Sequence, residues 1–253
     1  MNDTVSARTT AAGTTPPGTM NQQQASQWVQ RMFAGIAPKY DLANHILSFN
    51  IDRGWRKRLM QRLAPVLARP EAKILDLCCG TGDVLLDFQT ASASPIIGAD
   101  FCHPMLVAAQ EKTRQKRFAA PLFEGDALQL PLREGTLDAI AISFGFRNLA
   151  NYGEGLTELH RVLKPGGTLA ILEFSHPPGV FMKLGYGFYS NVLLPVIGTL
   201  VSGSPEAYRY LPDSIRKFPS ADRLREMMAA AGFRAAQYEL LTGGIAAIHA
   251  GNK

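Results

Sequence analysis

Residues 74–83 read ILDLCCGTGD, and this stretch decides the fold. Residues 74–77 have the apolar, β-favouring character of a buried strand, and a helical pattern begins near residue 83. Glycines at 80 and 82 allow the tight turn between the two elements and let a ligand approach the main chain closely. The stretch therefore predicts a strand, a glycine turn and a helix at the ligand-binding edge of an α/β sheet.

Short apolar segments and helical patterns alternate on both sides of this turn. We expect strands at 73–77, 95–100, 122–125, 137–144 and 168–174, and helices near 83–91, 104–118 and 152–163. Near the end, 233–240 and 245–250 are joined by Thr-Gly-Gly at 242–244, which indicates a hairpin. This alternation predicts a doubly wound, mostly parallel, seven-stranded Rossmann-like sheet with an antiparallel last strand.

The chain divides into three parts by composition. Residues 1–25 are rich in Thr, Ala, Pro and Gln and predict a disordered tail. Residues 26–69 predict a small helical cap, with one helix from Gln27, a break at Pro38 and a second helix at 51–67. Residues 70–253 form the main domain, with an insertion at about 179–218 as a substrate lid; its uncharged part, 184–201, is interpreted as a hydrophobic wall in preference to a membrane span.

Composition narrows the classes of partner. The 253 residues carry a formal net charge of +5, which does not require nucleic acid and fits weak attraction to an anionic membrane surface. Three cysteines, two of them adjacent, do not form a disulfide framework and fit a reducing cytoplasm. The five histidines are dispersed, so we expect no metal site.

The glycine turn suits two classes of ligand unequally. A dinucleotide site would have a third glycine where this chain has Leu85, and its pyrophosphate would be repelled by Asp83. S-adenosylmethionine carries an ammonium and a sulfonium, so Asp76 and Asp83 become favourable neighbours. We therefore expect Asp76, Gly80 and Gly82 to surround this cofactor; the competing interpretation is a turn with only a structural role.

Later carboxylates fall where such a cofactor needs them. Asp100 ends the second strand, twenty positions after Gly80, where a carboxylate can accept from both ribose hydroxyls. Asp126, beside Ala127, ends the third strand and is placed to accept from the adenine amino group. Ser143 closes the fourth strand. Arg147 and Asn148 follow it into the crevice outside the strand ends.

Two longer segments carry a family resemblance. Residues 161–175, RVLKPGGTLAILEFS, resemble the second signature of the ubiquinone/menaquinone biosynthesis C-methyltransferases. Residues 40–48 through Trp55 resemble the first signature, with Ala43 in place of the usual Met and Asp52 in place of the usual His. Similarity continues through 143–148 and 208–216 and covers about residues 28–250. It implies a class I S-adenosylmethionine-dependent methyltransferase with cofactor contacts at Thr81, Asp100, Asp126 with Ala127, and Ser143.

The resemblance also implies the reaction, C-methylation of a prenylated quinol. We expect Arg147 with Asn148 to stabilise the developing oxyanion, and Tyr40 with Asp41 to close over the ring. The favoured substrate is a prenylated naphthoquinol, demethylmenaquinol, reached by transient contact with the inner membrane surface; nucleic acid is not an expected partner, and assembly into a homo-oligomer stays open.

Three alternatives remain at this point. A benzoquinol precursor of ubiquinone is the nearest, because closely similar enzymes serve it. A nicotinamide oxidoreductase is a different class, disfavoured by the missing third glycine. A module that binds S-adenosylmethionine without catalysis is the last.

Overall fold

Within the described residues, seven strands form one sheet in the order β3-β2-β1-β4-β5-β7-β6. The computed structural model describes residues 13–37, 40, 51–118, 120–179 and 205–253. The strands are β1 (Ile74–Leu77), β2 (Ile97–Asp100), β3 (Leu122–Glu124), β4 (Leu137–Ser143), β5 (Leu163–Phe174), β6 (Arg234–Leu241) and β7 (Ala246–Asn252).

The ladders confirm the predicted topology. β3, β2, β1, β4 and β5 are joined by parallel pairing, and β7 is antiparallel to both of its neighbours, β5 and β6. The chain order reverses direction between β1 and β4, and at such a switch point the loops at the carboxyl ends of the strands separate and leave a crevice. The expected ligand site therefore lies beside the glycine turn after β1.

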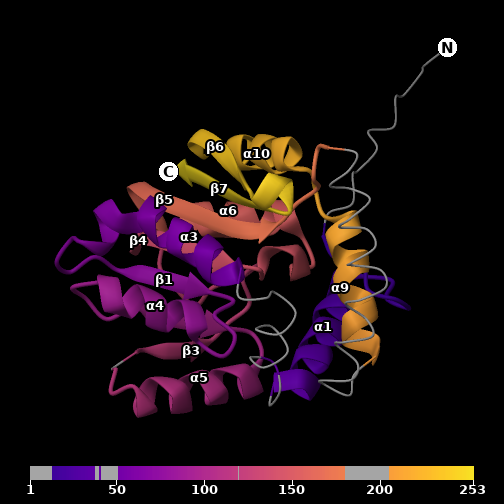
Figure 1. Cartoon of the computed structure of the whole chain (residues 1–253), viewed down its shortest axis with the longest axis horizontal. Coiled ribbons are helices and arrows are strands. Elements are labelled where there is room, and N and C mark those ends of the chain that lie inside the picture. The colour runs from indigo at the N-terminus through magenta and orange to yellow at the C-terminus, as the bar shows by residue number, and fades with distance from the viewer. Residues whose placement is uncertain (1–12, 38–39, 41–50, 119, 180–204) are drawn as a thin grey trace.

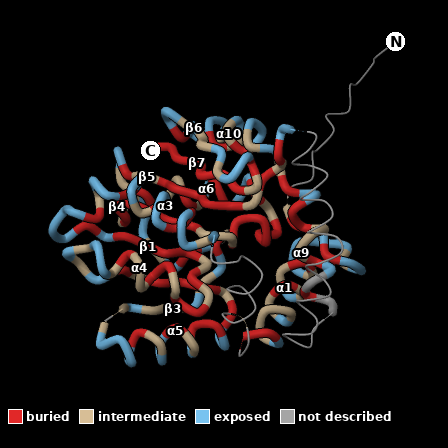
Figure 2. The backbone as a smooth tube through the Cα atoms, in the orientation of Figure 1, coloured by how far each residue is buried: buried red, intermediate tan, exposed pale blue. Residues whose placement is uncertain are grey.

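Helices cover both faces of this sheet (Figure 1). On one face, α3 (Ile51–Leu67) and α4 (Asp83–Ala91) pack in one apolar cluster with the side chains of β1 and β4. On the other, α6 (Tyr152–Val162) and α10 (Ala221–Ala230) contribute to a second cluster. In Figure 2 the central strands are buried along most of their length, whereas the helices expose their outer sides. The sheet residues are apolar for this reason.

Three further helices stand at the carboxyl edge and beside β3. α5 (His103–Gln115) follows β2, and α1 (Gln22–Ile36) lies side by side with α9 (Pro205–Lys217) at the right of Figure 1. The rings of Trp28 and Tyr210 join α1 to α9 with centroids 5.0 Å apart. Gln30 Nε2 donates to the carbonyl of Phe101, 2.6 Å away, and ties α1 to the end of β2. α1 therefore lies across the carboxyl ends of the strands.

The structure departs from the sequence expectation in residues 13–25. α1 begins at Gln22, where Asn21 accepts from the Gln24 N–H, and the segment before it packs against the main domain. Thr14 N–H donates to the carbonyl of Leu149 at 2.8 Å, and the Thr14 side chain is buried. A Cβ on Gly13 would lie 2.1 Å from the Ala150 oxygen, so only glycine fits there. Composition alone indicated disorder because these contacts are made with distant parts of the chain.

Smaller differences have local causes. β5 begins at Leu163 instead of near 168, because Leu163 already pairs with Leu137 before the register shifts at the Pro-Gly-Gly turn. The uncharged stretch 184–201, the tail 1–12 and Asp41 lie outside the described residues. Among the helices that are described, none is long and apolar enough to cross a membrane.

Candidate active site

A pocket opens at the carboxyl edge of the sheet, beside the glycine turn. It encloses about 670 Å³ of empty space, which includes space open to solvent. The loops after β1, β2, β3 and β4 line it, and α1 contributes Ser26 and Phe33. Seven of the predicted residues line this one pocket: Tyr40, Gly80, Asp100, Asp126, Ala127, Ser143 and Asn148.

Asp100 is the most tightly held carboxylate at the pocket. Its Oδ2 accepts from the Gly80 N–H and its Oδ1 from the Cys102 N–H, both at 2.9 Å. Burial raises the pKa of Asp100 to about 6, against the lowering effect of these backbone hydrogen bonds. The two bonds fix the carboxylate plane and leave further lone pairs for hydroxyl donors.

The glycine turn is shaped by two close approaches. Gly82 has φ +87°, and a Cβ there would lie 3.2 Å from the Cβ of Ala109 on α5. Gly145, in the loop after β4, leaves no room either, because its Cβ would meet the Cβ of Cys78 at 2.3 Å. The loops after β1 and β4 are thus packed backbone to side chain, which keeps the Gly80 main chain at the pocket wall.

Two buried acceptors near the turn lack partners. Both carboxylate oxygens of Asp76 and the Ser143 hydroxyl make no hydrogen bond among the described residues. Burial and the neighbouring charge of Asp100 hold the pKa of Asp76 well above its usual range, although the N–H of Leu85 at the start of α4 opposes this in part. An unpartnered carboxylate that is 1% exposed is costly without a donor or cation. It fits a site that receives a positively charged ligand.

Asp83 is placed differently from the expectation. Its Oδ1 lies 2.6 Å from Lys112 Nζ and its Oδ2 lies 3.3 Å from Arg56 Nη1, on the side of α4 that faces α3 and α5. These two cations lower the pKa of Asp83 against the effect of burial. Asp83 therefore serves to tie three helices together, and it does not line the pocket. Thr81 also meets Lys112, its Oγ1 3.3 Å from Nζ, and lies outside the pocket lining.

Arg147 lies behind the pocket wall. Its guanidinium is 3.0 Å from Glu173 Oε1, donates to the carbonyl of Phe144, and stands over the Phe174 ring at 5.5 Å from the centroid. Glu173 also accepts from the Arg147 backbone N–H at 3.2 Å. Both side chains are buried, and Arg147 is not among the residues that line the pocket. The pair fixes the 3₁₀ turn Phe146–Asn148 that carries Asn148.

Asn148 is the polar side chain that this turn brings to the pocket. Its Oδ1 accepts from the Tyr210 hydroxyl at 3.0 Å, and that hydroxyl lies 2.7 Å from Thr14 Oγ1. Sequence reasoning missed Tyr210, Thr14 and Glu173. Glu173 lies within the second signature, but its partner could not be read from spacing; Thr14 gave no signal at all.

Comparison with known proteins now identifies the group to which this fold and pocket belong. The sequence model of the ubiE/COQ5 methyltransferase family matches residues 20–253. The chain belongs to the ubiE/COQ5 methyltransferase family. A demethylmenaquinone methyltransferase of Thermus thermophilus is 47% identical over 88% of this chain and 100% of its own length. One from Deinococcus radiodurans is 44% identical over 96% of this chain and 99% of its own.

Solved structures agree on the fold. The [4+2]-cyclase SpnF matches with a TM-score of 0.69 at 16% identity, over 96% of this chain and 98% of the other. A SAM-dependent methyltransferase from Aquifex aeolicus matches with a TM-score of 0.56 at 18% identity, over 77% of this chain and 88% of the other. At these identities the likeness concerns the fold alone.

Membership in the ubiE/COQ5 family makes the chain an S-adenosylmethionine-dependent methyltransferase. This excludes the nicotinamide oxidoreductase and the non-catalytic module. The pocket fits the cofactor, because the held carboxylate of Asp100 lines it and the buried, unpartnered Asp76 lies one residue before Leu77, which also lines it. No group of three metal-ligating side chains occurs in the described part of the chain.

Proposed function

We propose that the enzyme methylates a ring carbon of demethylmenaquinol, giving menaquinol and S-adenosylhomocysteine. The observation that carries this proposal is the pair of relatives named demethylmenaquinone methyltransferase, which are 47% and 44% identical over nearly their full lengths. We further propose that Gly80, Asp100, Asp126, Ala127 and Ser143 contact the cofactor, since they share the pocket wall. The Asp76 carboxylate, buried behind the glycine turn, is proposed to stabilise the positive charge of the cofactor.

S-adenosylmethionine supplies, when bound, a methyl group on a positively charged sulfur. The protein must align the ring carbon with that methyl group, exclude water and favour the phenolate form of the quinol hydroxyl. Asn148 is the polar donor we assign to the phenolate oxygen, because its side chain lies at the pocket wall. Tyr40 is proposed to cover the ring together with Asp41, which lies outside the described residues.

The pairing of Arg147 with Glu173 changes the role that we propose for Arg147. Its charge is compensated by Glu173 at 3.0 Å, so direct contact with the oxyanion is not the simplest role. We assign it to holding the turn that presents Asn148.

A methyl-transfer assay tests the substrate. Purified enzyme is incubated with labelled S-adenosylmethionine and either reduced demethylnaphthoquinol or the methoxy-benzoquinol precursor of ubiquinone. Label in the naphthoquinol supports the proposal. Transfer to the benzoquinol alone assigns the ubiquinone pathway instead, which remains the second candidate because three ubiquinone/menaquinone enzymes from Geotalea and Geobacter species are 41% to 42% identical.

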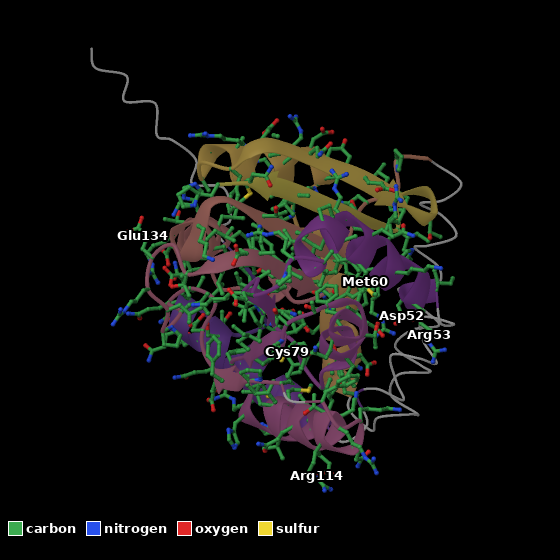
Figure 3. All side chains as sticks on the ribbon, turned by 90° about the vertical axis from the view of Figure 1, so that its left-hand side faces the viewer. Asp52, Arg53, Met60, Cys79, Arg114 and Glu134 are labelled. Carbon is green, nitrogen blue, oxygen red and sulfur yellow. The ribbon has the colours of Figure 1, made fainter. Side chains whose placement is uncertain are left out.

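The prenyl tail of this substrate requires contact with a bilayer, and α3 offers a suitable surface. The helix holds five Lys and Arg against one Asp, whereas the whole chain holds 26 Lys and Arg against 21 Asp and Glu. Arg53, Lys57 and Arg62 are exposed and make no ion pair within the described residues. Figure 3 shows Arg53 projecting from the end of α3 at the outside of the molecule. We propose that this basic side touches anionic lipid at the cytoplasmic face.

Vesicle sedimentation tests the lipid contact. Lys57→Gln with Arg62→Gln should lower partitioning onto phosphatidylglycerol vesicles by roughly 30-fold at low salt, since each cation near an anionic surface contributes about 1 kcal/mol. The control, Arg225→Gln with Arg234→Gln, removes one half-buried charge from α10, 3.7 Å from Asp222, and one exposed charge from β6. Equal losses for both double variants would mean that α3 has no special role.

A further inference from the structure

A chain of three hydrogen-bonding groups runs from the N-terminal segment to the pocket. Thr14 Oγ1 is 2.7 Å from the Tyr210 hydroxyl, and that hydroxyl is 3.0 Å from Asn148 Oδ1. All three side chains are buried, Thr14 with 6% of its surface exposed. Thr14 lies before residue 20, where the match to the family begins, so this contact is additional to the matched residues.

The protons in this chain can be placed by counting acceptors. Thr14 Oγ1 contacts no other acceptor among the described residues, so its proton goes to the Tyr210 oxygen. The single proton of the Tyr210 hydroxyl is then directed to Asn148 Oδ1. Burial raises the pKa of Tyr210 to about 12, which keeps that proton in place at neutral pH. The direction of donation therefore runs from Thr14 through Tyr210 to Asn148.

This direction determines which end of the Asn148 amide faces the pocket. With Oδ1 turned to Tyr210, the Nδ2 group finds no acceptor among the described residues and remains for the pocket that Asn148 lines. If Thr14 did not donate, the Tyr210 oxygen could accept from Nδ2 instead, and the amide could rotate to present Oδ1 to the pocket. A donor to the substrate would then become an acceptor.

We infer that Thr14 and Tyr210 are positioning residues that hold the Asn148 amide with its NH₂ group toward the pocket. The inference rests on the proposed function, in which that group donates to the phenolate oxygen of the substrate. Contacts with other parts of the chain hold the segment that carries Thr14 in place. Gly13 packs against the Ala150 carbonyl, Thr14 N–H donates to Leu149 at 2.8 Å, and Lys217 Nζ donates to the carbonyl of Thr15 at 3.1 Å.

The decisive variants change only the hydroxyl. Thr14→Val keeps the shape and removes the donor, Thr14→Ser keeps the donor, and Thr15→Val is the matched control at an exposed neighbour. We expect Thr14→Val to lower kcat about 10-fold, with the Kd for S-adenosylmethionine unchanged within two-fold. Complete loss of an oxyanion donor lowers kcat about 100-fold or more, and here the Asn148 amide is redirected but not removed. Thr14→Ser should restore kcat to within two-fold.

Two further readouts separate positioning from mere stability. A donor to the phenolate lowers the pKa of the bound phenol, so Thr14→Val should move the acidic limb of the kcat profile to higher pH. The ¹⁵N side-chain amide signal of Asn148, recorded without substrate, should shift in Thr14→Val and Tyr210→Phe but not in Thr15→Val. The kcat of the double variant, Thr14→Val with Tyr210→Phe, should be no lower than that of Tyr210→Phe alone, because both substitutions interrupt the same chain of hydrogen bonds.

The outcomes distinguish this inference from the proposed substrate. Wild-type enzyme that methylates demethylmenaquinol, combined with full kcat and an unmoved Asn148 signal in Thr14→Val, overturns the inference and leaves the function standing. Wild-type enzyme that methylates neither quinol overturns the function, whereas the Asn148 signal still decides the orientation of the amide. A Thr14→Val loss that Thr14→Ser fails to restore assigns Thr14 to packing only and also overturns it.

Discussion

Asp76→Asn should stabilise the cofactor-free enzyme and weaken its binding of S-adenosylmethionine. The carboxylate is 1% exposed, and its oxygens make no hydrogen bond of ordinary geometry in the described part of the chain, although the Leu85 N–H faces it. A buried acceptor left in this state costs about 1 to 3 kcal/mol, more when it is charged. Asparagine is of similar size and uncharged, so we expect a gain of about 1 to 2 kcal/mol in the free energy of unfolding.

The pH dependence of this gain has a definite sign. Burial and Asp100 raise the pKa of Asp76 in the folded state above its unfolded value, so the wild type loses stability as the pH rises from about 4 through that folded pKa. The advantage of Asp76→Asn should therefore be small near pH 4 and full at higher pH. Urea unfolding of both proteins across this range measures it.

Cofactor affinity supplies the other half of the test. A carboxylate 6 to 8 Å from a cation, at an effective dielectric constant of about 20, contributes roughly 2 to 3 kcal/mol. Calorimetry should accordingly give a Kd for S-adenosylmethionine raised at least about 10-fold in Asp76→Asn, with little change for adenosine, which carries neither the ammonium nor the sulfonium. Because Leu85 N–H at the start of α4 faces Asp76, the opposing reading is a helix cap. Lower stability with unchanged affinity would establish the cap and refute our reasoning.

Three other predictions concern the pocket and the sheet. Arg147→Ala should lower the free energy of unfolding by about 3 to 5 kcal/mol, because it leaves the buried Glu173 carboxylate without its partner. It should also reduce turnover, while the cofactor affinity measured by calorimetry survives. Adding Glu173→Gln should recover part of the stability and none of the turnover, and recovery of turnover would contradict the role given to the pair. Affinity for S-adenosylmethionine should fall as the pH drops below about 6, where Asp100 gains a proton in the free enzyme, and Asp100→Asn should flatten that profile; a wild-type affinity constant from pH 5 to 7.5 would argue against a carboxylate contact. His249 is buried, and desolvation lowers its pKa to about 4 against the hydrogen bond to the Ala221 carbonyl and the charge of Asp222. The free energy of unfolding should therefore fall by about 3 kcal/mol as the pH drops from 6.5 to 4, and denaturant titrations of His249→Leu should lack this loss.

Sequence patterns predicted the sheet well because a buried parallel strand leaves a local signal. Ile74–Leu77 and Leu137–Ser143 are apolar runs bounded by turn residues, and their observed bounds lie within a residue or so of expectation. The β6–β7 hairpin was readable from its turn, which Thr-Gly-Gly at 242–244 marks.

Contacts between distant segments were beyond such patterns. Asp83 was expected beside the cofactor, but Lys112 and Arg56 come from helices 29 and 27 residues away along the chain and take up its charge. Thr14 sits in a segment of disordered composition, and its order depends on Leu149 and Tyr210. Composition indicates how much apolar surface a segment can bury by itself, and it does not report the contacts that other segments of the chain provide.

The position of β7 has a consequence for how the protein is made. This strand pairs with β5 on one side and β6 on the other, and Lys253, which follows it, exchanges backbone hydrogen bonds with Gly166 and Gly167. β7 follows both of its partners in the chain, so the edges of β5 and β6 that it pairs with stay open in a nascent chain until β7 has been made and has left the ribosomal exit tunnel. A need for chaperone protection before β7 is made, and loss of the sheet when β7 is deleted, follow from this order of closure.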